Sequence, residues 1–120
     1  MKPTERTLKE RTRAGKTWTE ARYWGFIRSA LRMAWQKYPV KWQVKKSASR
    51  PSQLTDKRTK FEYQCSLCKG WFKGKEAEVD HVEPAGRLKN YHDLPGFVAR
   101  LFCEKDNLRV LCKACHKDVT

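Results

Sequence analysis

Leu-Cys-Lys-Ala-Cys-His, residues 111–116, is the stretch that decides the fold of this 120-residue chain. It holds the second of two Cys-x-x-Cys pairs, Cys112 and Cys115; the first pair is Cys65 and Cys68, and 43 residues separate the two pairs. Two such pairs can present four thiolates to one tetrahedral ion at about 2.3 Å, which is the ligand set of a structural Zn²⁺ site. We therefore expect a four-cysteine zinc site that ties together the two ends of this region.

Two other uses of these cysteines are less favoured. A reducing compartment disfavours a pair of disulfides, and a redox dithiol normally has a single Cys-x-x-Cys beside a βαβ pattern. Gly70 follows the first pair and is expected to supply a positive φ there. The fifth cysteine, Cys103, follows an apolar Leu-Phe and is expected to be a buried small hydrophobe. A module with so little apolar core is expected to draw much of its folding free energy from the metal.

The charge of the chain points to a polyanionic partner. Lys and Arg number 27 against 13 Asp and Glu, a net charge of +14, of which residues 1–60 carry +13 and residues 61–120 carry +1. A solubilising charge run is the alternative, but four tryptophans are interleaved with the basic residues, which favours nucleic-acid binding. No segment has the ~20 consecutive apolar residues of a membrane span, and residues 1–16 lack the apolar core of a secretory signal, so we expect a cytoplasmic protein without membrane contact.

The first half of the chain is predicted to have three parts. Residues 1–16 are expected to be a disordered basic arm, 17–46 a basic amphipathic helical region, and 47–60 a polar linker before the module at 61–120. Pro39 is expected to end the helix, since the residue before a proline disfavours helical geometry. The helix has an apolar stripe, for which we favour a place in the core over a role in binding. The stripe is formed by Trp24, Ile27, Leu31, Trp35 and Tyr38.

A second amphipathic segment lies within the 43-residue stretch between the cysteine pairs. Its apolar residues recur at helical spacing, and Pro95 is tolerated in a first turn. We expect a short helix here that covers the zinc side of the module and leaves the Asp80 side open. The apolar positions are Leu94, Phe97, Val98, Leu101 and Phe102.

Two further stretches carry polar residues with a recognisable order. They are Val-Asp-His-Val-Glu-Pro at 79–84 and Glu-Lys-Asp-Asn-Leu-Arg-Val-Leu-Cys-Lys-Ala-Cys-His at 104–116. Together they resemble the HNH endonuclease family, in particular its small phage-encoded, zinc-stapled members, and the resemblance covers about residues 20–118. It implies a ββα-metal (His-Me) finger: an α+β fold stapled by the four-cysteine site and preceded by the basic helix and arm.

The resemblance also implies the roles of individual residues. Asp80 and His116 would hold a catalytic divalent cation (Mg²⁺, Mn²⁺ or Ni²⁺), His81 would be the general base, and Asn107 would position the His81 loop. Side chains of neighbouring strand residues point to opposite faces, so the strand must end or bend at His81 for Asp80 and His81 to share a site. Asn107 is expected to open a second strand at 108–111, followed by a helix that starts near Lys113.

Each of these residues also has a purely structural interpretation. His81 can be a hydrogen-bonded histidine at a strand end, His116 a zinc ligand that replaces a cysteine, and Asn107 a turn former. His92 is expected to be a surface residue. Six basic residues are predicted to contact phosphate: Arg28, Arg32, Arg87, Lys89, Arg109 and Lys113. Exposed solubilising charge is the alternative for the last four.

The sequence as a whole predicts an HNH DNA endonuclease that hydrolyses phosphodiester bonds with weak sequence specificity. Its expected partner is double-stranded DNA, and the resemblance adds phage terminase or other packaging proteins, with the host bacterial cytoplasm as the location. The alternatives are a non-catalytic zinc-finger DNA-binding or regulatory protein and a scaffold for a packaging partner. The basic first half would serve all three.

Overall fold

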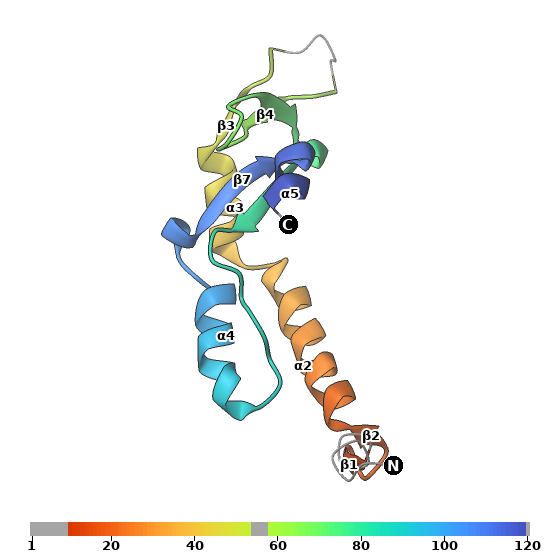
Figure 1. The fold of residues 1–120 in the computed structure, drawn as a ribbon. Coiled ribbons are helices and arrows are strands. Elements are labelled where there is room, and N and C mark those ends of the chain that lie inside the picture. The colour runs from red at the N-terminus through yellow and green to blue at the C-terminus, as the bar shows by residue number, and fades with distance from the viewer. Residues whose placement is uncertain (1–9, 54–57, 120) are drawn as a thin grey trace.

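The computed structural model describes residues 10–53 and 58–119 and shows a mixed α+β fold, as expected (Figure 1). The molecule is elongated, with principal extents of 62 × 26 × 24 Å. Three short 3-10 turns join the main elements at Gly74–Glu76, Tyr91–Asp93 and Lys105–Asn107. The helices and strands, in chain order, are β1 (Arg11–Arg13), β2 (Trp18–Thr19), α2 (Glu20–Trp35), α3 (Pro39–Ser47), β3 (Ser49–Pro51), β4 (Phe61–Gln64), β5 (Trp71–Lys73), β6 (Ala77–His81), α4 (Leu94–Leu101), β7 (Leu108–Cys112) and α5 (Lys113–Val119).

The predicted amphipathic region forms two helices. The Thr19 side chain caps α2 by accepting the Arg22 backbone N–H at 3.2 Å. The helix ends before Pro39, as expected, and this proline begins α3 because its fixed φ suits a first helical turn. The apolar stripe of α2 is core: Trp24 and Trp35 are buried.

Residues 10–16 correct the prediction of a disordered arm. β1 pairs with β2 through a turn in which Ala14, Gly15 and Lys16 have φ of 52°, 66° and 65°. Arg13 closes the hairpin, with its Nε 2.5 Å from a Glu20 carboxylate oxygen and its guanidinium 4.5 Å from the Tyr23 ring centre. These tertiary contacts offset the low apolar content on which the prediction rested. The rest of the predicted arm, residues 1–9, lies outside the described residues.

The predicted linker is also partly wrong. Ser49–Pro51 forms β3, which pairs antiparallel with β4, and β4 in turn pairs with β5. Arg50 explains the pairing: its Nε lies 2.5 Å from a carboxylate oxygen of the buried Glu62, and its guanidinium stacks 3.8 Å from the Trp71 ring centre. Sequence periodicity does not predict a strand of only three residues whose partner strand begins about ten residues further along the chain. Residues 54–57 of the predicted linker lie outside the described residues.

The second half is organised around β6 and β7, whose five antiparallel pairs run from Ala77 opposite Cys112 to His81 opposite Leu108. β6 ends at His81, α4 intervenes in the chain, and β7 leads directly into α5, so the two paired strands are followed by a helix. This agrees with the expected strand after Asn107 and the expected helix from Lys113. α5 contacts both strands.

The helix predicted near Pro95 is present as α4, but it does not cover the zinc side. Phe97 and Leu101 join Trp24 and Trp35 in one buried cluster, whereas Cys65, Cys112 and Cys115 belong to a second cluster. Figure 1 shows α4 beside α2, at the end of the molecule away from β3 and β4. The physical reason is that the apolar face of α4 has a matching stripe on α2.

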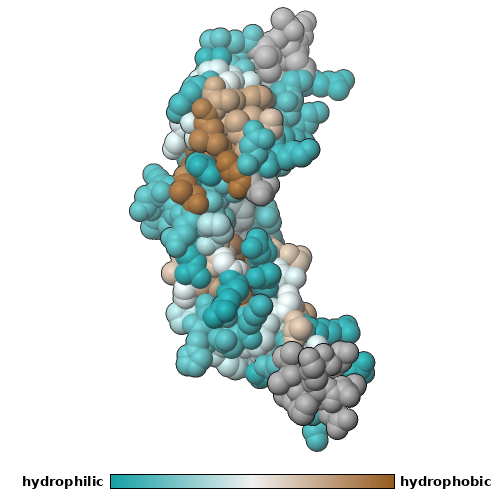
Figure 2. Space-filling view, in the orientation of Figure 1, coloured by the Kyte–Doolittle hydropathy of each residue, from teal (hydrophilic) through white to brown (hydrophobic). Residues whose placement is uncertain are grey.

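The surface agrees with the strongly polar composition. In Figure 2 the visible face is mostly hydrophilic, and hydrophobic side chains gather in its upper half, over the end that holds β3, β4, β7 and α5. Among the described helices, none combines the length and the apolar character that a bilayer span requires.

Candidate functional site

The four paired cysteines converge on one point. The sulfur atoms of Cys65, Cys68, Cys112 and Cys115 all lie within 4.8 Å of one another, and those of Cys68 and Cys112 are 3.9 Å apart. Tetrahedral ligands at about 2.3 Å from an ion would be about 3.8 Å apart, so the cluster can hold a structural metal such as zinc. In the described part of the chain, no other three His, Cys, Asp or Glu side chains gather as closely. Cys103 is buried outside this cluster, as expected.

The first cysteine pair sits on a tight turn. The Cys65 N–H donates to the Gly70 carbonyl at 2.9 Å, and the Lys69 N–H donates back to the Cys65 carbonyl at 3.0 Å. The positive φ of 63° falls on Lys69 and not on Gly70, which corrects the prediction. Gly70 is required for space instead, because a Cβ there would lie 3.0 Å from the Phe72 ring.

The cysteine thiols have unequal affinities for protons. Burial alone would raise the pKa of Cys65, but the backbone groups of Cys68, Cys112 and Leu67 hydrogen-bond to its sulfur and lower the pKa to about 6. The side chains of Cys112 and then Cys65 raise the pKa of Cys115 to about 12. The lowered pKa of Cys65 favours its thiolate, which is the form in which a cysteine binds a metal ion.

A separate cleft of about 350 Å³ brings together three of the predicted site residues, Asp80, His81 and His116. Asp80 is near the end of β6 and His116 lies on α5. The Asp80 Oδ1 and the His116 Nε2 are 3.5 Å apart, a separation that one ion with bonds of about 2.1 Å can bridge. The other carboxylate oxygen of Asp80 lies 3.4 Å from the Arg109 guanidinium.

Glu78, which the sequence analysis did not single out, orients His116. Its Oε2 lies 2.9 Å from the His116 Nδ1. In the neutral ring Nδ1 must donate to this carboxylate, so the lone pair of Nε2 is directed toward Asp80. Two acceptor atoms that face each other suit a cation between them. The available signal was the period of two along β6, which places Glu78 and Asp80 on the same face.

His81 is the last residue of β6 and packs against two elements of the first core cluster. Its Nε2 lies 2.9 Å from the Leu101 carbonyl oxygen at the end of α4, and its ring centre is 4.6 Å from that of Trp35. Because a carbonyl oxygen can only accept, Nε2 carries the proton and Nδ1 keeps a lone pair. Such an imidazole can accept a proton from water. Nothing in the sequence marks the Leu101 carbonyl.

Asn107 holds the segment that follows His81. Its Oδ1 accepts the Glu83 N–H at 2.7 Å, and its Nδ2 donates to the carbonyls of Glu83 at 3.2 Å and Arg100 at 3.4 Å. Its backbone carbonyl accepts the Val82 N–H at 2.8 Å. Asn107 thus joins β7, the end of α4 and the loop after β6.

The six basic residues predicted to contact phosphate do not form one cluster. Arg32 and Arg109 line the cleft with the three site residues, Arg32 from α2 and Arg109 from β7. Lys113 is exposed at the start of α5. Arg32 and Arg109 therefore place positive charge at the cleft, whereas Lys113 does not line it.

The other three basic residues lie along α2 and the loop before α4. The Arg28 guanidinium donates to the Gly86 carbonyl at 3.2 Å, and Arg87, whose side chain is 70% exposed, pairs with Asp93 at 3.3 Å. The Lys89 backbone N–H donates to the same Asp93 carboxylate at 3.0 Å. This loop therefore has an ordered basic surface, and none of the three basic residues lines the cleft.

Comparison with known proteins does not identify a relative of this chain. A scan against protein-family models finds no match for this chain, and comparisons with curated proteins and with solved structures find none either.

Proposed function

We propose that the chain is a metal-dependent DNA endonuclease of the HNH type. The observation that carries the proposal is the cleft in which the Asp80 carboxylate faces the His116 imidazole at 3.5 Å, with His81 beside them. The order of β6, β7 and α5 and the resemblance of residues 79–84 and 104–116 to the HNH pattern support a ββα-metal finger. The four-cysteine cluster would hold its structural Zn²⁺.

The donor set of the cleft fits a divalent cation. One carboxylate oxygen and one imidazole nitrogen suit Mg²⁺, Mn²⁺ or Ni²⁺, and Asp80 and His116 would hold the ion. When bound, such an ion neutralises charge on the phosphoryl and leaving oxygens of the scissile phosphodiester. Glu78 keeps the His116 ring in the tautomer that can bind.

His81 would act as the general base. Its Nδ1 would take a proton from the attacking water, and the Leu101 carbonyl, already bonded to Nε2, would stabilise the resulting imidazolium. Asn107 would restrain the loop after His81 so that the ring keeps its place. Arg32 and Arg109 line the same cleft and would contact the phosphate on either side of the cut.

Double-stranded DNA is the proposed substrate. The excess of positive charge, +13 of the net +14 in residues 1–60, predicts salt-sensitive binding with weak sequence specificity. The resemblance to phage-encoded nucleases extends the proposal to action in the cytoplasm of a bacterial host, together with terminase or other packaging proteins.

A plasmid nicking assay with zinc-loaded protein tests the proposal. Added Mg²⁺ or Mn²⁺ should produce nicked circles, and omission of both ions should stop the reaction. His81→Ala should lower the rate by about 100-fold or more, the usual contribution of a general base. His92→Ala is the matched control, because His92 is an exposed histidine that does not line the cleft, and it should nick at the wild-type rate.

A second candidate function is that of a non-catalytic zinc-finger DNA-binding or regulatory protein. It is favoured by the pairing of Asp80 with Arg109 and of His116 with Glu78, which can serve structure alone. Duplex binding without any metal-dependent nicking would establish it. Nicking that persists unchanged in His81→Ala would remove His81 from the proposed mechanism.

A further inference from the structure

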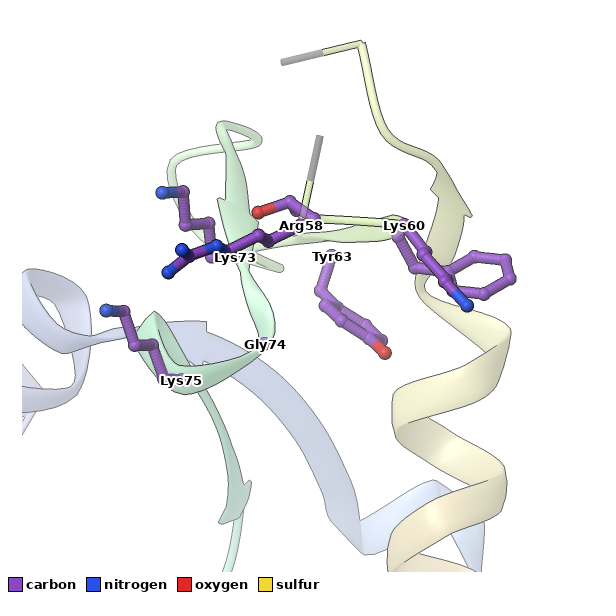
Figure 3. A pocket seen from close by; sticks show the side chains of 8 residues that line it. Arg58, Lys60, Tyr63, Lys73, Gly74 and Lys75 are labelled. Carbon is purple, nitrogen blue, oxygen red and sulfur yellow. The ribbon is translucent and has the colours of Figure 1, made fainter. Parts of the chain in front are cut away.

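A second charged surface lies on α3, β4 and the segment that follows β5, on elements other than those that form the nuclease cleft. It consists of two adjoining hollows of about 520 and 310 Å³ that share Phe61 and Tyr63 as a common wall. In Figure 3 Tyr63 lies between Lys60 on one side and Lys73 and Lys75 on the other. We call the two hollows together the aromatic–lysine surface; it shares no lining residue with the cleft.

Two large rings on this surface are more than half exposed. Trp42, on α3, is 63% exposed and Phe61, on β4, is 52% exposed, and both line the smaller hollow. The alternation along β4 places Phe61 and Tyr63 on one face and Glu62 on the other, where Glu62 is buried against Arg50. The one acidic side chain of β4 is therefore kept away from the rings.

Basic groups border the rings from α3, from the residue before β4 and from the segment after β5. Lys46 lines the smaller hollow and Lys60 and Lys75 the larger one, and over the described residues no acidic side chain lines either hollow. Lys45 lines the smaller hollow and reaches Gly74, which lines the larger one. Its Nζ donates to the Gly74 carbonyl at 2.9 Å and lies 5.0 Å from the Tyr63 ring centre. Partial burial lowers the pKa of Lys45.

We propose that the aromatic–lysine surface binds a single-stranded nucleic acid, with bases stacked on Trp42 and Phe61 and phosphates beside the lysines. Exposed rings next to lysines match both halves of an unpaired strand, its base faces and its charge. A duplex would use only the lysines, because its bases are already stacked on one another. The proposal does not depend on nuclease activity.

Fluorescence anisotropy with labelled oligo(dU) and oligo(rU), which differ only in the sugar, tests this, using the full zinc-loaded chain without added Mg²⁺ or Mn²⁺. Trp42→Ala and Phe61→Ala should each weaken binding about fivefold or more, the lower end of the effect of removing one stacking ring. Trp42→Phe keeps a ring and should lose much less. Phe26→Ala is the control, since Phe26 is 60% exposed but its ring packs on Trp18 with centres 5.1 Å apart, and it should bind as the wild type does.

The lysines provide an independent readout. For single strands the slope of log affinity against log salt falls by about 0.7 for each phosphate that is no longer neutralised, so Lys60→Ala and Lys75→Ala should each reduce it by about this amount. Binding of either oligomer with these reductions supports the proposal, and the tighter of the two identifies the sugar. Unchanged binding in Trp42→Ala and Phe61→Ala, with circular dichroism as for the wild type, would overturn it, as would an equal loss for a blunt duplex.

Discussion

Removal of the Asn107 side chain should loosen the loop after His81. Asn107→Ala deletes three hydrogen bonds, one accepted from the Glu83 N–H at 2.7 Å and two donated to the Glu83 and Arg100 carbonyls at 3.2 and 3.4 Å. Each such bond contributes about 0.5–1.5 kcal/mol net, and the longest of the three contributes least. We therefore expect the free energy of unfolding to fall by about 1.5–3 kcal/mol.

Asn107→Asp separates hydrogen bonding from side-chain size. The carboxylate can still accept the Glu83 N–H, but its second oxygen would lie near the Glu83 carbonyl oxygen, which now receives a donor at 3.2 Å. Two acceptors at that distance repel each other, so this nearly isosteric change should destabilise the protein at least as much as Asn107→Ala does. If Asn107 contributed only by packing, the aspartate variant would be about as stable as the wild type.

Three measurements check this reasoning together. Urea unfolding should give the loss of about 1.5–3 kcal/mol, equivalent to a lower melting temperature by roughly 6–12 °C. Hydrogen exchange should accelerate at the Glu83 amide more than in α2, because the damage is local. Metal-dependent nicking should fall in both variants. A wild-type exchange rate at the Glu83 amide, or an Asn107→Asp variant as stable as the wild type, would refute the role of these hydrogen bonds in restraining the loop after His81.

Two further predictions concern the cysteine cluster and acid stability. Cys112→Ser should lose bound zinc and much of the circular dichroism signal, since a structural zinc site contributes about 10–16 kcal/mol of apparent folding free energy. Cys103→Ser is the control and should keep the metal. Retained zinc in Cys112→Ser would contradict the four-cysteine site. The Lys89 backbone N–H and then Arg87 hold the pKa of Asp93 below its ordinary value of 3.8, so its stabilisation is complete above pH 3.8 and is lost as the pH falls toward the lowered value. Asp93→Asn should therefore flatten the loss of stability below pH 3.8 in acid titrations followed by circular dichroism.

Local spacing was enough to predict the elements whose signal repeats along the chain. The stripe from Trp24 to Tyr38 and the run from Leu94 to Phe102 each mark a helix face, and both helices are present because their faces bury against each other. The two Cys-x-x-Cys pairs predicted the cysteine cluster, since two such pairs can present four thiolates to one tetrahedral ion. These features depend on residue types at fixed intervals.

The features that were missed depend on contacts between distant segments. β1 and β3 are three residues long and carry no periodic signal; Arg13 and Arg50 stabilise them through carboxylates on other elements. The place of α4 against α2 was also mispredicted, because an amphipathic helix shows which face it buries but not which partner covers it. The positive φ at Lys69 is likewise set by the turn around the cysteines.

Only part of the candidate cleft could be predicted from the sequence. Asp80, His81 and His116 were selected through the resemblance of residues 79–84 and 104–116 to the HNH pattern, and they do line one cleft. Glu78 could have been found from the alternation along β6. The Leu101 carbonyl, which fixes the His81 tautomer, could not be found, because a backbone group has no residue type to recognise.

The cysteine cluster and the cleft are parts of one structural unit. α5 has seven residues, too few for an isolated helix to be stable in water, and its Cys115 lies immediately before His116. On the neighbouring strand, Ala77 lies opposite Cys112, three residues before Asp80. A metal bound by the cysteines therefore restrains both partners of the Asp80–His116 pair through short, directly connected segments, which explains how so small a core can hold two side chains 3.5 Å apart.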